Sequence, residues 1–336
     1  MSLSEVDLRD LGIFRIPVPV PFPQAGGPVN VYLLEETGGG FLLFDAGLDT
    51  DVAREAVAEG FKALGRRFSE VTRVVVSHGH VDHYGGARTV QEAHGGELPV
   101  FAHPADLPKI DESGPRWKDL APRYGEEFAR LGVPAEVVAA IAGTGESTRR
   151  MARRVRGVRP VGEGDVLRLR HVTLEILHMP GHTPGLVCAY DRERRIFLSD
   201  DHLLEKVSPN PLIEISPDGE APRFRPLVAY LESAARMRAL DVDLVLPGHG
   251  PPFAEHRRVI DSLVSFYGKR QARILGLLEE RPRTIWEITT ALFPAARPLD
   301  SFLTVSEVVA NVEVLEARGA VARALDDGTY RFHPVP

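Results

Sequence analysis

Residues 77–86 read Ser77-His78-Gly79-His80-Val81-Asp82-His83-Tyr84-Gly85-Gly86 and follow the apolar run Val71-Thr72-Arg73-Val74-Val75-Val76. The apolar run predicts a strand that is buried on both faces. At the end of a strand the chain opens into a loop, so three histidines and an aspartate can converge on one point. Imidazole nitrogens and carboxylate oxygens bind zinc and other first-row metals. Four such groups exceed what one tetrahedral ion with an open position takes, which indicates two ions.

Alternating strand and helix signals surround this motif. Apolar runs bounded by turn residues predict strands at 14–20, 29–34, 41–44, 98–101, 166–169, 172–177, 186–190, 195–198 and 242–246. Helical periodicity predicts helices at 51–64, 87–93 and 226–240. Residues 105–157 carry helical patterns and no convincing strand. The sequence therefore predicts a layered α/β domain over 1–254 with a helical cap inserted at 105–157.

A second domain is predicted from the elements that follow residue 254. Residues 260–278 show one long amphipathic helix, Thr284 and Glu287 have capping-box spacing, and a further helix spans 306–318. The tail predicts a hairpin around Asp326-Asp327-Gly328. Three helices followed by a hairpin predict a winged-helix-like domain at 255–336.

More ligand-type residues stand in turns after later strands. These are His182 in Pro180-Gly181-His182-Thr183-Pro184-Gly185, Asp201 in Ser199-Asp200-Asp201-His202, and His249 in Pro247-Gly248-His249-Gly250. Glycine and proline in the first and third of these turns allow the chain to turn sharply, so a side chain can project from the edge of a sheet. Together with the first motif they predict a shared metal centre.

In this order, these residues resemble the metallo-β-lactamase superfamily over about residues 10–254. The resemblance implies a mixed α/β (α+β) fold, a four-layer αββα sandwich with the site at one edge of its two sheets. It also implies the following ligand sets: His78, His80 and His182 for one ion, Asp82, His83 and His249 for the other, with Asp201 bridging. The helical tail resembles the glyoxalase-II-like branch that carries a C-terminal winged helix.

Four further positions matter for this resemblance. Asp45, in the turn Phe44-Asp45-Ala46-Gly47, matches the aspartate at a strand end that supports a metal-bound histidine in the family. The family usually has glycine before the bridging aspartate, whereas this chain has Asp200, and we assign the bridge to Asp201. His202 beside the motif and Arg270 on the long helix are candidate substrate contacts.

The function implied is hydrolysis, in which a hydroxide held between two divalent ions attacks a thioester, lactone or other small ester. We expect zinc, with iron and manganese as alternatives, and we expect Asp82 to orient the hydroxide and shuttle its proton. Two alternatives stay open: a metal-dependent endoribonuclease and a mononuclear iron oxygenase of the persulfide-dioxygenase type. The only cysteine, Cys188, sits in an apolar strand, which argues against the β-lactamases that bind metal through cysteine.

The composition of the chain limits the kinds of partner that we expect it to bind. The 336 residues carry a formal net charge of −7, and residues 258–336 contain ten basic and ten acidic side chains, which argues against nucleic-acid binding. The start of the chain is too charged for a signal peptide, and no apolar run reaches membrane-spanning length. We therefore expect a cytoplasmic enzyme with a small, anionic substrate and no membrane partner.

Overall fold

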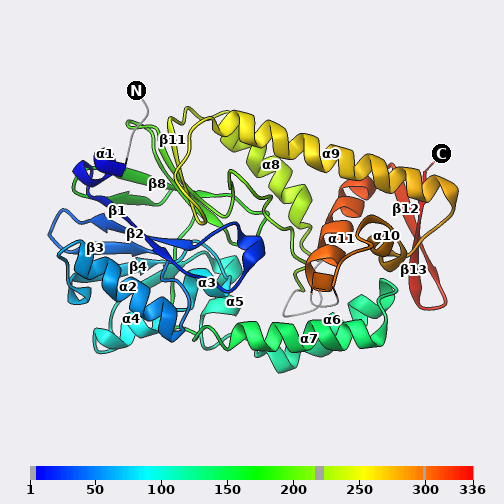
Figure 1. Ribbon diagram of the computed structural model, residues 1–336, viewed down its shortest axis with the longest axis horizontal. Helices are drawn as coiled ribbons and strands as arrows, with labels where there is room; N and C mark the ends of the chain where they lie inside the picture. Colours follow the sequence, from blue (N-terminus) through cyan, green and yellow to red (C-terminus); the bar gives the residue numbers. More distant parts are fainter. Residues whose placement is uncertain (1–4, 216–222, 298–299, 336) are drawn as a thin grey trace. The chain divides into compact units, whose positions relative to one another are not determined.

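The computed structural model describes residues 5–215, 223–297 and 300–335. The chain divides into two compact units, and Figure 1 labels many of their helices and strands. The first unit contains residues up to Gly114 together with 148–209 and 234–260. The second contains 115–147, 210–233 and 261 onward. Helices α8 (Pro226–Arg238) and α9 (His256–Glu280) each have residues in both units.

The first unit is built on two sheets. The first sheet has the strand order β1-β2-β3-β4-β5-β6, with bounds Ile13–Val18, Val29–Glu35, Phe41–Phe44, Val71–Val75, Val100–Ala102 and Arg159–Pro160. Strands β1 to β3 pair antiparallel, and β3 to β6 pair parallel. A parallel neighbour needs a crossover connection, which helix α2 (Asp51–Ala63) supplies between β3 and β4. The carboxyl ends of β3 and β4 consequently lie at one edge of the sheet.

The second sheet has the strand order β11-β10-β9-β8-β7. Its strands, in chain order from β7, are Val166–Arg168, Thr173–His178, Val187–Asp191, Ile196–Asp200 and Leu244–Pro247. Strands β7 to β10 form an antiparallel meander, and β11 joins β10 in parallel. Strands β10 and β11 therefore also end at a common edge.

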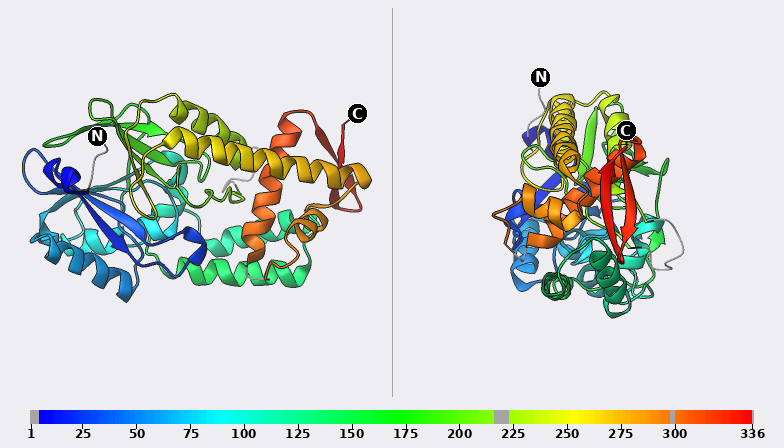
Figure 2. Two further views of the ribbon diagram at one scale, coloured as in Figure 1. Left: turned by 45° about the horizontal axis from the view of Figure 1, so that its top comes forward. Right: turned by 90° about the vertical axis from the view of Figure 1, so that its right-hand side faces the viewer.

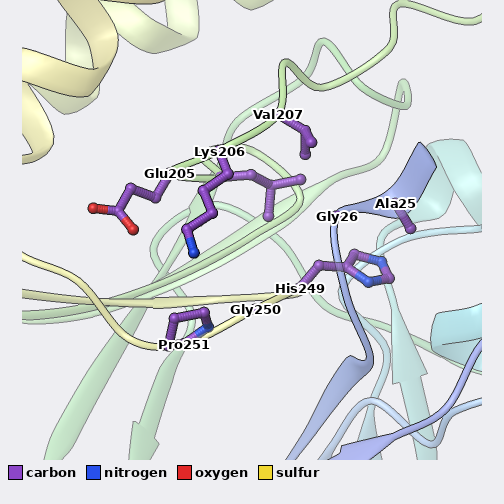
Figure 3. A pocket seen from close by; sticks show the side chains of 9 residues that line it. Ala25, Gly26, Glu205, Lys206, Val207, His249, Gly250 and Pro251 are labelled. Atoms are coloured by element: carbon purple, nitrogen blue, oxygen red, sulfur yellow. The ribbon is translucent and has the colours of Figure 1, made fainter. Parts of the chain in front are cut away.

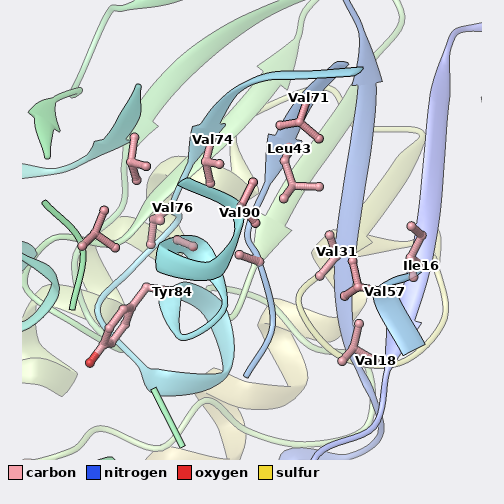
Figure 4. Packing of buried hydrophobic residues seen from close by; sticks show 14 of the residues in the cluster. Ile16, Val18, Val31, Leu43, Val57, Val71, Val74, Val76, Tyr84 and Val90 are labelled. Carbon is pink, nitrogen blue, oxygen red and sulfur yellow. The ribbon is translucent and has the colours of Figure 1, made fainter. Parts of the chain in front are cut away.

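Side-chain alternation along the first sheet separates two cores. Leu33 and Leu43 belong to the core under helices α2 and α4 (Ala87–Ala93), which Figure 4 shows at close range. Their neighbours Leu34 and Leu42 point the other way and pack against apolar residues of the second sheet. Because successive side chains of a strand face opposite sides, one sheet contributes to both cores. The two sheets thus form a sandwich with helices on the outer face of the first sheet.

Short helical segments complete the first unit: α1 (Glu5–Asp10), α3 (Val81–Tyr84) and α5 (Leu107–Ile110), with the 3-10 turns η1 (Pro23–Ala25), η2 (Phe68–Glu70) and η3 (Pro104–Asp106). The last turns of α8 also belong here. Arg236 on α8 donates a hydrogen bond to the carbonyl of His178 at 2.9 Å, which ties this helix to the end of β8.

The second unit is mostly helical and has its own apolar core. Its elements are α6 (Trp117–Arg130), most of α7 (Ala135–Arg149), most of α9, α10 (Ile285–Leu292), α11 (Ser301–Ala317) and the hairpin of β12 (Val321–Asp326) and β13 (Thr329–Pro334), visible in Figure 2. Phe128 of α6 and Ile141 of α7 share one core with Val308 of α11 and Phe332 of β13. The predicted cap helices and the C-terminal elements therefore pack into the same unit.

Two local predictions for this unit are confirmed. Glu287 donates its backbone N–H to Thr284 Oγ1 at 3.1 Å, and its carboxylate accepts the N–H of Thr284 at 2.8 Å, which is the reciprocal capping box. Asp327 and Gly328 both adopt positive φ, 45° and 77°, as a two-residue hairpin turn requires. Within the described ranges, no helix has the length and apolar content needed to cross a membrane.

Candidate metal centre

The loop that carries the first histidines connects β4 to α3. Strand β4 ends at Val75 and α3 begins at Val81, so His78 and His80 lie in the connecting loop and Asp82 and His83 lie on the first turn of the helix. His78 and His83 are buried, with 1% and 0% of their surface exposed. Burial of so many polar side chains at a strand end requires partners that compensate for lost hydration.

His78, His80 and His182 form the first group, with ligand-type atoms that all lie within 4.8 Å of one another. Nε2 of His78 and Nδ1 of His80 are 3.0 Å apart. Two nitrogens bound to one zinc ion at about 2.0–2.1 Å with tetrahedral angles would stand about 3.3–3.4 Å apart. The loop after β4 and the turn after β8 thus bring three imidazoles to one point.

Asp82, His83 and His249 form the second group. Oδ2 of Asp82 lies 3.4 Å from Nε2 of His249 and 3.9 Å from Nε2 of His83. His249 comes from the turn after β11, whereas the other two come from α3. The second group therefore joins the two sheets at their common edge.

Asp201 lies between the two groups. Its Oδ2 atom is 3.4 Å from Nε2 of His182, 3.5 Å from Nε2 of His83 and 3.6 Å from Nε2 of His249. A single carboxylate thus faces one histidine of the first group and two of the second. This is the position that a ligand shared between two ions would take.

The ring nitrogens that face away from this centre have partners of their own. His78 Nδ1 lies 2.9 Å from Ser77 Oγ and 3.1 Å from Asp200 Oδ1. His83 Nδ1 lies 2.9 Å from Asp45 Oδ2. Such contacts orient the imidazoles and leave the opposite nitrogen available for a metal.

Asp45 joins the two strand ends that carry the site. Its Oδ1 accepts the backbone N–H of Ser77 at 2.7 Å, and its Oδ2 accepts the Ser77 hydroxyl at 2.8 Å while facing His83. Asp45 has φ 62° and Asp200 has φ 47°, both in the left-handed region that few residues other than glycine adopt. These two supporting carboxylates are therefore held by unusual backbone turns at the ends of β3 and β10.

Burial and neighbouring charges set the protonation of the centre. Burial lowers the pKa of His80 well below its usual range, and His182 and His78 lower it further, which favours the neutral ring that binds metals. Burial acts to raise the pKa of Asp201, but the charges of His249 and His83 bring it well below the usual range. Asp201 is therefore a carboxylate at neutral pH, and it concentrates negative charge where a cation would bind.

Among the residues that the structure describes, three buried polar atoms at this centre lack a hydrogen bond, which is expected at a site for a divalent metal. Nε2 of His83, Nε2 of His249 and Oδ1 of Asp201 are buried and have no hydrogen-bond partner within the described part of the chain. A buried polar atom without a partner is costly, and a metal ion would satisfy all three. A set of imidazoles and carboxylates without thiolates suits zinc and other first-row divalent ions.

Two residues of β2 hold the turn that carries His249. Asn30 Nδ2 donates to the carbonyls of Pro247 and Gly250 at 2.8 and 2.7 Å, and the Tyr32 hydroxyl donates to the carbonyl of Pro247 at 2.8 Å. His249 Nδ1 lies 3.1 Å from the carbonyl of Gly27. A Cβ atom at position 248 would stand 2.3 Å from Oδ1 of Asp201, so a side chain there would displace this carboxylate.

The two predicted substrate contacts lie in different units. His202 is buried directly after Asp201, and burial, with His182 and Arg236, lowers its pKa to about 3. Arg270 belongs to the second unit, where its guanidinium lies 3.6 Å from Glu307 and over the ring of Phe293. Contact of either residue with substrate stays a prediction.

Several supporting residues were not predicted from the sequence. Ser77, Asn30 and Tyr32 hold the ligand loops, and Asp106 contacts two of those loops from η3. Ser77 stands next to the motif and could have been noticed. The other three lie far from any ligand in sequence, and their roles depend on contacts that no local pattern reveals.

A small, open pocket lies beside His249 within the first unit (Figure 3). Its walls come from η1 and the segments after β10 and β11: Ala25, Gly26, Leu204, Glu205, Lys206, Val207, His249, Gly250 and Pro251. One candidate ligand thus forms part of a pocket that also contains a lysine.

Comparisons with known proteins support a metal-dependent hydrolase. The "Probable metallo-hydrolase YqjP" of Bacillus subtilis is 31% identical over 325 residues, covering 94% of this chain and 97% of its own. The "Acyl-coenzyme A thioesterase MBLAC2" of Gallus gallus is 28% identical over 189 residues, which cover 54% of this chain and 58% of the relative.

The structural and family comparisons agree with these relatives. The crystal structure of "metallo-beta-lactamase family protein TTHA1429" from Thermus thermophilus superposes with a TM-score of 0.80 at 30% identity, covering 96% of this chain and 99% of that one. The family model described as "Metallo-beta-lactamase superfamily" matches residues 25–249, which include both groups of candidate ligands and Asp201. The chain therefore belongs to the metallo-β-lactamase superfamily.

Proposed function

We propose that this protein hydrolyses an ester-type bond in a thioester, lactone or other small ester, and that it does so with two zinc ions. The observation that carries the proposal is the position of Asp201 Oδ2, 3.4–3.6 Å from Nε2 of His182, His83 and His249. A carboxylate placed between two three-residue groups is suited to bridging two ions. The first ion would be held by the group of His78 and the second by the group of His249.

Two ions at such a site lower the pKa of bound water toward neutrality and polarise a carbonyl oxygen. The chain supplies the remaining steps. Asp82 is largely buried and directs Oδ2 toward the same centre as His83 and His249. We assign to Asp82 the proton transfer: it accepts a proton from the attacking water and returns it to the departing alkoxide or thiolate.

Two observations support an anionic ester or thioester as substrate. The MBLAC2 relatives are named acyl-coenzyme A thioesterases, and they match this chain at 24–32% identity. In the pocket beside His249, Lys206 is exposed and stands across from the turn that carries this histidine. An ammonium group there would attract a substrate carboxylate or phosphate.

The test combines metal analysis with a substrate panel. Elemental analysis of the purified protein should find two zinc ions per chain. Acyl-coenzyme A thioesters, lactones and simple aryl esters should be hydrolysed in a reaction that a chelator abolishes and zinc restores. Protein with both ions bound that cleaves none of these compounds would contradict the proposal. One iron per chain, or cleavage restricted to single-stranded RNA, would favour the oxygenase or the nuclease instead.

We infer that α9 to α11 and the hairpin form a winged-helix-like fold that does not bind nucleic acid. In support, Arg283 and Phe332 exchange backbone hydrogen bonds of 3.1 and 2.8 Å, which joins the segment before α10 to strand β13. Residues 258–336 have as many acidic as basic side chains. Fluorescence anisotropy with labelled duplex DNA should detect no salt-sensitive binding.

A further inference from the structure

Asp106 is a completely buried carboxylate, with 0% of its surface exposed, and it belongs to neither group of candidate ligands. It ends the 3-10 turn η3, which follows strand β5. A buried carboxylate is costly unless several donors satisfy it. The donors that satisfy Asp106 come from two loops of the metal centre.

Both carboxylate oxygens of Asp106 are used. Oδ2 accepts the backbone N–H of Gly79 at 2.7 Å and the hydroxyl of Thr183 at 2.6 Å. Oδ1 accepts the backbone N–H of Gly185 at 3.1 Å and lies 4.0 Å from Nζ of Lys109. One side chain therefore connects the loop after β4 to the turn after β8.

Two of these contacts involve residues that are adjacent in sequence to ligands of the first group. Gly79 stands between His78 and His80, and Thr183 follows His182. The packing is close, because a Cβ atom on Gly185 would lie 2.8 Å from both the backbone nitrogen and Cγ of Asp106.

The second group is supported by different residues. The Asp106 carboxylate accepts its hydrogen bonds from Gly79, Thr183 and Gly185. Asp82 is instead carried by α3, and the turn of His249 is held by Asn30 and Tyr32. Asp106 therefore acts on one side of the metal centre.

We propose that Asp106 is a positioning residue for the first metal ion: it sets the spacing of two loops so that His78, His80 and His182 converge. The proposal rests on the proposed function, because it assumes that the first group binds metal. Loss of the carboxylate leaves the Gly79 and Gly185 amides and the Thr183 hydroxyl without their acceptor, so the two loops separate. The second group should be unaffected.

The test measures zinc affinity in variants that retain one group each. In an H249A background, which leaves the first group intact, D106A should weaken zinc binding by about 10- to 100-fold, the effect typical of residues that orient metal ligands. In an H80A background, which leaves the second group intact, D106A should change zinc affinity by less than about twofold. Titration against a competing chelator gives both values.

Two further variants separate positioning from a general loss of stability. D106N keeps one acceptor oxygen but presents an amide N–H₂ to one side of the network. Its zinc affinity in the H249A background should therefore lie between those of the wild-type residue and D106A. D191N is the matched control: Asp191 is also buried, and it accepts backbone N–H groups of Thr173 and Arg194 away from the metal centre. D191N should leave both zinc affinities unchanged even where it lowers the melting temperature.

A measurement on metal-free protein tests directly whether Asp106 holds the two loops. In metal-free protein, D106N should increase amide hydrogen exchange at Gly79 and Gly185, while D191N should not. If D106A lowers zinc affinity equally in the H80A and H249A backgrounds, or lowers it in neither, Asp106 does not position the first group. Failure of the wild-type protein to bind zinc at all would instead overturn the proposed function, so the two failures can be distinguished.

Discussion

Asp200 and Asp201 present their carboxylates to opposite nitrogens of the same imidazole. Asp200 Oδ1 lies 3.3 Å from Nδ1 of His83, and Asp201 Oδ2 lies 3.5 Å from Nε2 of that ring. Asp200 also lies 3.1 Å from Nδ1 of His78. Two adjacent aspartates thus have different environments: Asp201 faces the proposed metal centre, and Asp200 supports two histidines from behind.

Replacing Asp200 by glycine should separate metal affinity from fold stability. Position 200 has φ 47°, a conformation that costs a non-glycine residue about 1–2 kcal/mol, and the aspartate adds a buried charge near Asp45. We expect metal-free D200G to melt close to the wild-type temperature, because the strain that it relieves is offset by the lost contacts with His78, His83 and the N–H of Asp201. Its zinc affinity should fall by about 10- to 100-fold, because His78 and His83 each lose a carboxylate partner. Thermal melts and chelator competition measure the two effects, and unchanged affinity would show that Ser77 and Asp45 orient the rings without help.

Replacing Asp82 by alanine should abolish turnover by removing the proposed proton carrier. We expect kcat to fall by about 10²- to 10⁴-fold in protein whose metal content has been restored and verified by elemental analysis. D51A is a suitable control, because the Asp51 side chain is 88% exposed at the start of α2. A D82A variant with full metal content and a near wild-type rate would exclude this mechanism.

Replacing Lys206 by alanine should weaken binding of an anionic substrate without slowing the chemical step. Because Lys206 is exposed, the gain from a charge contact is of order 1 kcal/mol, so KM should rise by about three- to tenfold while kcat stays constant. The difference from the wild type should shrink at high salt. K62A removes a lysine from the surface of α2, where it pairs with Glu59, and should leave KM unchanged. If a neutral ester shows the same rise in KM, Lys206 does not act through charge.

The stability of the second unit should depend on pH through Glu313. Burial raises the pKa of Glu313 to about 7, against the opposing effect of Arg223 and Arg225. Since the folded state binds this proton more tightly than the unfolded state, whose carboxyl has a pKa near 4.5, the free energy of unfolding should fall as pH rises from 4.5 to 7. The loss attributable to this residue is on the order of 3 kcal/mol.

Urea unfolding followed by tryptophan fluorescence can test this dependence, because both tryptophans, Trp117 and Trp286, belong to the second unit. E313Q should flatten the slope between pH 4.5 and 7. E279Q, which changes an exposed glutamate on α9, should retain it. An E313Q variant with the wild-type slope would assign the pH dependence to other groups.

The parts of the fold that were predictable have local signals. The run before Ser77 identified β4, the Thr284 and Glu287 spacing identified the start of α10, and Asp327 with Gly328 identified the hairpin turn. Each depends on residues within one element or one turn. The histidine motif was equally readable, because packing alone does not require four ligand-type side chains within one short segment.

Other features depend on long-range contacts and could not be read from the sequence. Asp106 lies 27 positions from Gly79 and 77 from Thr183, so nothing near it in the chain indicates its partners. Likewise, the amphipathic pattern of α6 predicts a buried face but does not show that Phe128 shares a core with Val308 and Phe332. Periodicity shows that a surface is buried, but the partner that covers it is set by the tertiary fold.

Cys188 should not react with thiol reagents while the protein is folded. It is completely buried, its Sγ donates to the carbonyl of Ser199 at 3.3 Å, and burial raises its pKa well above the usual range. If acyl-coenzyme A test substrates are cleaved as proposed, a colorimetric thiol reagent can therefore follow the released thiol in real time without background from the intact protein. The same reagent would label Cys188 once the chain unfolds, so a single dye could report both turnover and loss of the native state.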